Sequence, residues 1–287
     1  MRRWRRRCLS CENTRPQIAS PFPPKVSEMA SPSRPSHRPS AREPEGPTLI
    51  WGTHAVEAAL RNPARRIARA FLTDNAEHRV ADVLATRGLK PERILPRDLD
   101  RRLGPDTVHQ GSLVETEQLV EPRLEAMAAA AAGRPLVLLD HITDPHNAGA
   151  ILRSAAVFGC GGVVMTKRHS PPLSGALAKT ASGALEHVPV ALVQNLARSM
   201  AELKGLGLRL IGLDGDGTVD LADVAWPWTS AIVLGAEGRG LRELTRETCD
   251  EIACIGADGP LASLNVSNAA AVALHLAQLR RRGQGAG

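Results

Sequence analysis

The chain has 287 residues, of which 43% are hydrophobic and 23% charged, a composition typical of a globular protein with one or two domains. No apolar run approaches the roughly 18 residues that a membrane helix needs, so we expect no membrane span. Five cysteines are too few for a small disulfide scaffold. Aromatic residues make up only 2% and tyrosine is absent, which disfavours a protein that stacks single-stranded bases on aromatic rings.

The net charge of +6 belongs to the first 46 residues. This segment holds ten Lys/Arg and four Asp/Glu, so the rest of the chain carries 26 residues of each sign. It is rich in Pro, Ser and Arg and has no helical or strand periodicity, so we expect residues 1–46 to form a disordered basic extension. A targeting peptide for an organelle, an RNA-attracting arm and a later start at Met29 are alternatives. Because the segment lacks the apolar core of a secretion signal, we expect a cytoplasmic protein.

Residues 48–121 predict a small α/β module. Its expected elements are strands at 49–51 and 67–72 and helices at 55–60 and 77–86. Thr53 is the expected cap of the first helix. Residues 122–134 are Ala-rich and end at Gly133, which favours a helical linker.

From Pro135 onward, fully apolar strands alternate with helices. The expected strands are 136–139, 162–165, 188–193, 208–213, 231–234 and 251–255; the expected helices are 148–158, 196–204, 241–245 and 263–280, with a helical or loop segment at 172–183. This alternation is typical of a parallel sheet covered by helices on both faces. Ligands of such sheets bind beyond the carboxyl ends of the strands, so the loops that follow the strands are the candidate sites.

The first such loop, residues 140–153, contains Asn147 and Arg153. Six helical residues correspond to about 600° of rotation, so the two side chains lie on different stripes, although Arg is long enough to reach back to the helix start. An Arg in an apolar helix needs an anionic partner if it is buried. A structural pair with Asp140 or Asp144 is one interpretation, and a contact with a phosphate or a reacting hydroxyl is the other.

The second loop reads Gly235-Ala236-Glu237-Gly238-Arg239-Gly240. Its glycines permit a close approach of backbone to ligand, or simply a tight strand–helix turn. The spacing GxxGxG differs from the dinucleotide pattern GxGxxG, which disfavours an oxidoreductase.

The third loop brings four polar residues to the start of the last helix. They are Ser263, Asn265, Ser267 and Asn268. One of them is the expected N-cap, and four exceed what capping requires. Neutral amides and hydroxyls suit a polar, uncharged ligand.

Together the three segments NAGAILRSA, IVLGAEGRGL and SLNVSNAAAVAL resemble the signature motifs of the SpoU/TrmH family of S-adenosylmethionine-dependent RNA ribose 2′-O-methyltransferases. The resemblance runs from about Leu49 to Arg282. The segment IWGTHAVEAAL is similar to the start of the family's RNA-binding domain, and His109-Gln110-Gly111 resembles its HQG element. The layout is most similar to the 23S rRNA (guanosine-2′-O-)-methyltransferase branch. A tRNA methyltransferase and a non-catalytic RNA-binding factor of the same fold are alternatives.

The resemblance implies a parallel-sheet, trefoil-knotted α/β methyltransferase domain of the SPOUT type over residues 135–282, preceded by an RNA-binding domain at 48–121. It also implies a homodimer, an rRNA substrate and S-adenosylmethionine as methyl donor, with no metal. The family's cofactor contacts, made largely through backbone groups, match Gly235, Ile255 and Leu264. Its catalytic residue matches Arg153, supported by Asn147, Glu237, Ser263 and Asn265.

The chemistry expected of this site starts from a donor that is already activated and a hydroxyl that is a weak nucleophile. Because a guanidinium stays protonated, we expect Arg153 to hold the adjacent RNA phosphate and stabilise the developing alkoxide, while the phosphate, a water or Glu237 takes the proton. The family commonly has Ile-Pro-Met where this chain has Ile255-Gly256-Ala257, so a looser loop and weaker donor binding are expected. A local phosphate-binding patch is expected at Lys167, Arg168, His169 and Lys179.

Overall fold

The computed structural model describes residues 46–226, 229–256, 259 and 263–284. The expected disordered extension therefore lies outside the described residues, except for Gly46 at its end. The described residues contain a four-stranded and a seven-stranded sheet. Among them no helix is both long and apolar enough to cross a membrane.

The four-stranded sheet is mixed and has the strand order β1-β4-β2-β3. Its strands are β1 (Thr48–Trp51), β2 (Ile67–Leu72), β3 (Glu92–Arg93) and β4 (Ser112–Thr116), and its helices are α1 (Thr53–Arg61), α2 (Asp74–Arg79), α3 (Ala81–Arg87) and α4 (Pro96–Leu103). The central β4 runs antiparallel to β1 and β2, whereas β3 is parallel to β2. The two expected strands are confirmed; β3, β4 and α4 were not expected.

The first module also corrects two local predictions. Thr53 does not cap α1: Gly52 occupies the N-cap position, and the Thr53 backbone N–H donates instead to Gln110 Oε1 at 3.1 Å. The helix expected at 77–86 is two helices, because the chain leaves helical geometry at Val80. Val80 is itself buried, so the break between α2 and α3 places this side chain in the core and is not a turn on the surface.

The seven-stranded sheet is parallel throughout and has the order β7-β6-β5-β10-β8-β11-β9. Its strands are β5 (Leu136–Leu139), β6 (Gly162–Thr166), β7 (Val190–Val193), β8 (Arg209–Leu213), β9 (Val219–Asp220), β10 (Ser230–Leu234) and β11 (Glu251–Cys254). Its helical segments are α5 (Leu124–Ala131), α6 (Pro145–Phe158), α7 (Gly175–Thr180), η1 (Ala184–Glu186), α8 (Leu196–Gly205), α9 (Glu243–Thr248) and α10 (Val266–Gln284). The expected strands and helices are confirmed with shifted ends; the two-residue β9 and the short η1 were not expected.

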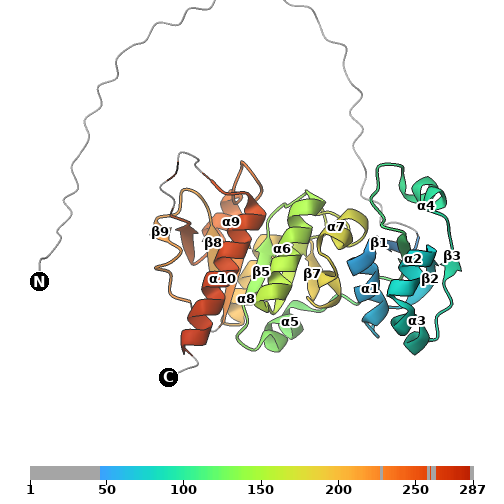
Figure 1. Ribbon diagram of the computed structural model, residues 1–287. Helices are drawn as coiled ribbons and strands as arrows, with labels where there is room; N and C mark the ends of the chain where they lie inside the picture. Colours follow the sequence, from blue (N-terminus) through green and yellow to red (C-terminus); the bar gives the residue numbers. More distant parts are fainter. Residues whose placement is uncertain (1–45, 227–228, 257–258, 260–262, 285–287) are drawn as a thin grey trace, which may run out of the picture. The chain divides into compact units, whose positions relative to one another are not determined.

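Helices cover both faces of this sheet. Val137 and Leu139 pack in one core with residues of α6, α7 and α10, while Leu136 and Leu138 pack in the other with residues of α5 and α8. Figure 1 shows α6 and α10 side by side on one face. Burial of both faces explains why the central strand β5, Leu-Val-Leu-Leu, is apolar at every position.

The Ala-rich segment at 122–134 contains α5 and packs onto the sheet. Leu124 and Met127 of α5 are buried in the second core. A Cβ added to Gly162 would lie 2.6 Å from the Met127 sulfur, so the helix packs closely against β6. The helix is thus part of one layer of the fold. The trefoil knot stays a prediction, because the path from β11 to α10 includes residues outside the described ranges.

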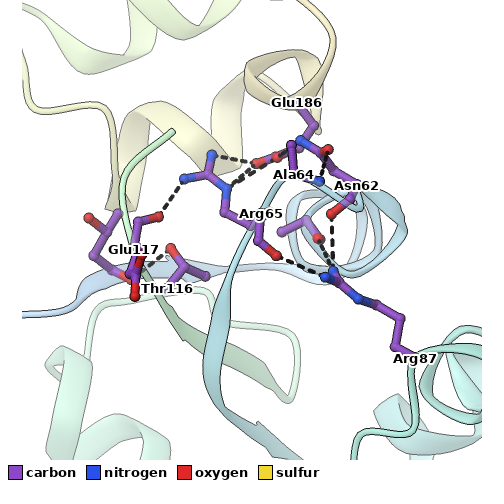
Figure 2. A network of polar contacts seen from close by, with 9 residues as sticks. Asn62, Ala64, Arg65, Arg87, Thr116, Glu117 and Glu186 are labelled. Atoms are coloured by element: carbon purple, nitrogen blue, oxygen red, sulfur yellow. Dashed lines mark hydrogen bonds and ion pairs between the residues drawn. The ribbon is translucent and has the colours of Figure 1, made fainter. Parts of the chain in front are cut away.

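A buried ion pair joins the two modules (Figure 2). The guanidinium of Arg65 lies 2.7 Å from Glu186, and the side chains are only 3% and 2% exposed. Asn62 Nδ2 donates to the same carboxylate at 2.7 Å, and Arg65 also donates to the Glu117 carbonyl at 3.0 Å. Arg87 donates to the backbone carbonyls around this corner, including that of Arg65 at 2.9 Å. The module of residues 48–121 is therefore held on η1 by a fully paired charge.

Replacing one partner of this pair should destabilise the protein strongly. We expect Glu186→Ala to lower the free energy of unfolding by about 3–5 kcal/mol, because Arg65 would be left buried without a counter-charge. Glu92→Ala, which removes the exposed pair with Arg69, is the matched control and should leave the stability close to that of the wild type, because solvent screens this pair. Urea denaturation measures both. Equal losses in the two variants would contradict a buried, specific connection.

Candidate functional site

The candidate site lies where three strands of the large sheet end. In the order β5-β10-β8-β11, the loops that follow β5, β10 and β11 leave from the same edge. They contain the three segments singled out in the sequence. Parallel strands all point the same way, so side chains from loops far apart in sequence meet at this edge.

Three side chains from these loops are hydrogen bonded to one another. Asn147 Nδ2 donates to Glu237 Oε1 at 3.0 Å, and Asn265 Nδ2 donates to Asn147 Oδ1 at 3.1 Å. Asn265 Nδ2 also donates to Glu237 Oε1. We call Asn147, Glu237 and Asn265 the polar triad. Glu237 Oε2 accepts no hydrogen bond from the described residues, so one carboxylate oxygen is left to bind a ligand.

Helix caps fix the two asparagines. Asp144 accepts from the His146 backbone N–H at 2.9 Å and caps α6, with Pro145 at the first helical position. Asn147 is thereby held in the first turn of α6, where it is buried. Asn265 Oδ1 accepts from the Ser267 backbone N–H at 2.9 Å and so is the cap of α10, while its Nδ2 faces the other two residues.

A glycine turn presents Glu237. The backbone at Ala236 bridges to Gly240, and Gly238 and Gly240 have φ of 74° and 64°. A Cβ added to Gly235 would lie 2.1 Å from the Gly240 carbonyl carbon. The tight turn alone therefore explains why residue 235 is a glycine. It is one of the two interpretations that the sequence left open, the other being a close approach of the backbone to a ligand.

The candidate cofactor residues border the same edge. Gly235 follows β10 and Ile255 follows β11, with β8 between them, which sets their strand ends about 10 Å apart. Leu264 precedes α10 and is 49% exposed, an apolar side chain without full cover. Ile255 is half-buried. These residues fit a flat ligand that is partly apolar and held by backbone groups.

Arg153 and Ser263 are not part of the polar triad. Arg153 is exposed on α6 and has no hydrogen bond or ion pair with a described residue. Neither proposed structural partner holds it, because Asp140 is paired with Arg242 at 2.7 Å and Asp144 caps α6. Ser263 is also exposed and forms no side-chain hydrogen bond within the described part of the chain.

Metal and thiol chemistry find no support in the described ranges. No group of three or more His, Cys, Asp or Glu side chains there could hold a metal ion. Burial raises the pKa of the Cys160 and Cys249 thiols to about 12, so neither supplies a thiolate at neutral pH.

Comparison with known proteins identifies relatives of both modules. Residues 134–275 match the model of the SpoU rRNA Methylase family, and residues 49–121 match the model for RNA 2′-O ribose methyltransferase substrate binding. The 23S rRNA (guanosine-2′-O-)-methyltransferase RlmB of Vibrio vulnificus is 37% identical over 240 residues, 81% of this chain and 97% of the relative. An uncharacterized tRNA/rRNA methyltransferase of Mycobacterium avium is 36% identical over 277 residues, 94% and 88% of the two chains.

A solved structure shares the fold. The SpoU methyltransferase AviRb from Streptomyces viridochromogenes, crystallised with the cofactor AdoMet, aligns with a TM-score of 0.69 and 23% identity. The alignment covers 82% of this chain and 91% of that one. Both modules of the chain therefore have an arrangement of elements that a crystal structure also shows.

The Asn265 side chain supplies both the cap of α10 and two hydrogen bonds of the polar triad, so its loss should be measurable as a loss of stability. Asn265→Ala should lower the free energy of unfolding by about 1 kcal/mol, because α10 loses its cap. Asn268→Ala, the same change at an exposed position one turn further into α10, should stay within about 0.5 kcal/mol of the wild type. Urea unfolding curves compare the two, and a harmless Asn265 change would argue against the cap.

Proposed function

The chain belongs to the SpoU rRNA methylase family and is an RNA 2′-O-ribose methyltransferase, and from this premise we propose that it methylates a guanosine of 23S rRNA with S-adenosylmethionine as donor. The observation that carries the proposal is the hydrogen-bonded polar triad, since it joins one residue from each of the three family motifs at one strand edge. The rRNA target is supported by the relative from Vibrio vulnificus.

A tRNA target is the second candidate. It is favoured by the relative from Mycobacterium avium, whose name leaves the choice between tRNA and rRNA open. A non-catalytic RNA-binding factor is disfavoured because Asn147, Arg153 and the sequence Ser263-Leu264-Asn265 are all retained.

We propose that Gly235, Ile255 and Leu264 hold the methyl donor. Backbone groups at the ends of β10 and β11 would bind its polar edge, and the exposed Leu264 would cover an apolar face. When bound, the donor supplies a methyl group on a sulfonium, which needs no further activation. Gly256 gives this loop more freedom than the Pro common in the family, so we expect modest donor affinity.

The polar triad would orient the ribose hydroxyl. Glu237 Oε1 is engaged by both asparagine amides, so Oε2 is the oxygen free to accept the hydroxyl hydrogen. Ser263 lies two residues before Asn265 and would contact the same nucleotide. Proton loss to Glu237 Oε2 leaves a developing alkoxide, and a guanidinium nearby stabilises that charge. We assign this role to Arg153, together with a contact to the adjacent RNA phosphate.

We also propose a homodimer formed through α6 and α10. Arg153 and Val157 lie on the exposed stripe of α6, and Val157 is 67% exposed. Val272 and Leu279, seven residues apart on α10, are also exposed large apolar side chains. The two helices are neighbours on one face of the sheet (Figure 1), so a second copy can cover both stripes and enclose Arg153.

The division of labour along the chain follows the family models. We propose that residues 48–121 bind the RNA substrate, that 122–134 connect the modules and that 135–282 carry out methyl transfer. We further propose a cytoplasmic enzyme, because its rRNA substrate is made there. Import into an organelle through residues 1–46 is the alternative.

Removing the Arg153 guanidinium should abolish turnover without removing the donor site. We expect Arg153→Ala to lower methyl transfer by about 10²–10³-fold or more, with the dissociation constant for S-adenosylmethionine within about threefold of the wild type. Transfer is measured as tritium in alkali-resistant dinucleotides of undermethylated rRNA, because a blocked 2′-oxygen prevents strand cleavage; calorimetry measures donor binding. Arg198→Ala, on the exposed side of α8, is the matched control. Loss of donor binding in Arg153→Ala would instead assign Arg153 a structural role.

Charge placed on the α10 stripe should separate the dimer. We expect Val272→Asp to yield monomers, because burying an unpaired carboxylate in an interface is costly. Val120→Asp is the control, since Val120 is 94% exposed and lies near the end of the first module, outside α6 and α10. Sedimentation equilibrium distinguishes one chain mass from two. A wild type that sediments as a monomer, or a Val272 variant that stays dimeric, would refute this interface.

A further inference from the structure

A cavity of about 450 Å³ lies at the same edge of the large sheet but over different strands. His141 follows β5, Arg168 and His169 follow β6, Asn195 follows β7, and Arg242 precedes α9. The candidate donor residues follow β10 and β11 instead. The cavity is therefore a neighbour of the polar triad, reached from it through the loop that contains both Glu237 and Arg242.

Two histidines on its wall are held in a backbone conformation that L-residues rarely adopt. His141 has φ of 57° and His169 has φ of 65°. Such a conformation is strained for a residue with a Cβ, and glycine would avoid the strain. Their rings nevertheless stack, with centroids 4.5 Å apart and planes 29° from parallel. Two loops thus adopt strained backbone conformations in which two imidazoles lie together, an arrangement typical of functional sites.

The charged groups of the cavity are mostly basic. Arg242 donates from Nε to Asp140 Oδ1 at 2.7 Å, and the Asp140 side chain is completely buried. The buried carboxylate fixes the guanidinium, which remains half-exposed and keeps other N–H groups free. Arg168 is exposed and has no ion pair with a described residue, and Glu243 is the acidic side chain on the wall. Lys167 and Lys179, expected in the same patch, are not part of the wall.

We propose that this cavity binds a phosphodiester group of the RNA strand next to the target ribose. The guanidiniums of Arg168 and Arg242 and the imidazoles are hydrogen-bond donors, and phosphate oxygens only accept. The proposal rests on the proposed function, because it gives the substrate of the polar triad a second point of attachment. Two such points fix the strand's register, which is what phosphate contacts do in nucleic-acid recognition.

Phosphate binding should be linked to proton uptake. The pKa of His141 lies below its usual value, chiefly because of burial and then because of the positive charge of Arg242, with His169 acting in the same direction and Asp140 against it. Arg168 and Glu243 are the other charged groups of the cavity. A bound phosphate favours the protonated imidazole, and because the pKa of His141 lies below the usual value of about 6.5, RNA affinity should rise as the pH falls below that value.

Glycine is a matched replacement at both positions, because it adopts positive φ without strain. We expect His141→Gly/His169→Gly to weaken binding of undermethylated rRNA about tenfold at pH 6 and less than threefold at pH 8.5. Its urea midpoint should equal or exceed that of the wild type, and S-adenosylmethionine binding should be unchanged. His187→Ala, an exposed histidine outside the cavity, is the control. Fluorescence anisotropy with labelled rRNA fragments measures affinity.

The outcomes separate the two proposals. Wild-type affinity and pH dependence in the double glycine variant, with methyl transfer by the wild type intact, would overturn the phosphate site alone. Absence of methyl transfer to rRNA by the wild type would overturn the proposed substrate and the site with it. Arg168→Gln should reduce the slope of log affinity against log salt by about one, whereas Arg198→Gln should not. Calorimetry with inorganic phosphate tests whether the cavity is a site for free phosphate instead. Tight binding of inorganic phosphate by the wild type, together with unchanged RNA affinity in the double glycine variant, would refute the RNA assignment.

Discussion

One carboxylate oxygen, Oε1 of Glu237, accepts hydrogen bonds from two amides that lie 90 and 28 residues away in the chain. These hydrogen bonds join the loops that follow β5, β10 and β11, and the pair of Arg242 with buried Asp140 is a further link between the first two of them. Asn147 is buried, and a buried amide without hydrogen-bond partners would destabilise the fold. The penalty would be comparable to the free energy that the hydrogen bonds contribute elsewhere in the protein. The polar triad therefore fixes both the shape of the edge and the direction in which Glu237 Oε2 points.

The same edge is connected to the module of residues 48–121 through packed helices. Gly149 of α6 lets α7 approach so closely that a Cβ there would lie 2.7 Å from the Thr180 side chain. The segment after α7 ends in η1, which carries Glu186 and its buried partner Arg65. Asn147 and Arg153 are on α6 as well. A continuous set of contacts thus relates the module that we propose binds RNA to the helix that carries the proposed chemistry.

Sequence predicted most of the large sheet because its inner strands are buried on both faces and contain short runs of apolar residues, such as Leu136–Leu139 and 231–234. It missed β4, whose end residues Ser112 and Thr116 are buried hydroxyls that donate to backbone carbonyls rather than apolar side chains. It placed the cap of α1 on Thr53, where the partner is Gln110, distant in the chain and invisible to local rules. Tertiary contacts decided each of these positions.

The site residues also divide into those whose position the sequence predicted and those whose position depended on tertiary contacts. Convergence of Asn147, Glu237 and Asn265 followed from motif order and from the parallel sheet. The exposure of Arg153 did not, because an apolar helix suggests burial and only the packed structure shows which stripe faces outward. The sequence did not predict the stacked pair of His141 and His169 either, because no local sequence pattern indicates a positive φ at these histidines.

The central claim is that three separated loops form one cleft for the methyl donor and the ribose. A crystal structure with S-adenosylmethionine bound tests it most directly. We expect the donor between the ends of β10 and β11, against Gly235, Ile255 and Leu264, with its methyl group directed toward the polar triad. A donor bound at another edge of the sheet, or one whose methyl group points away from Asn147 and Glu237, would contradict it.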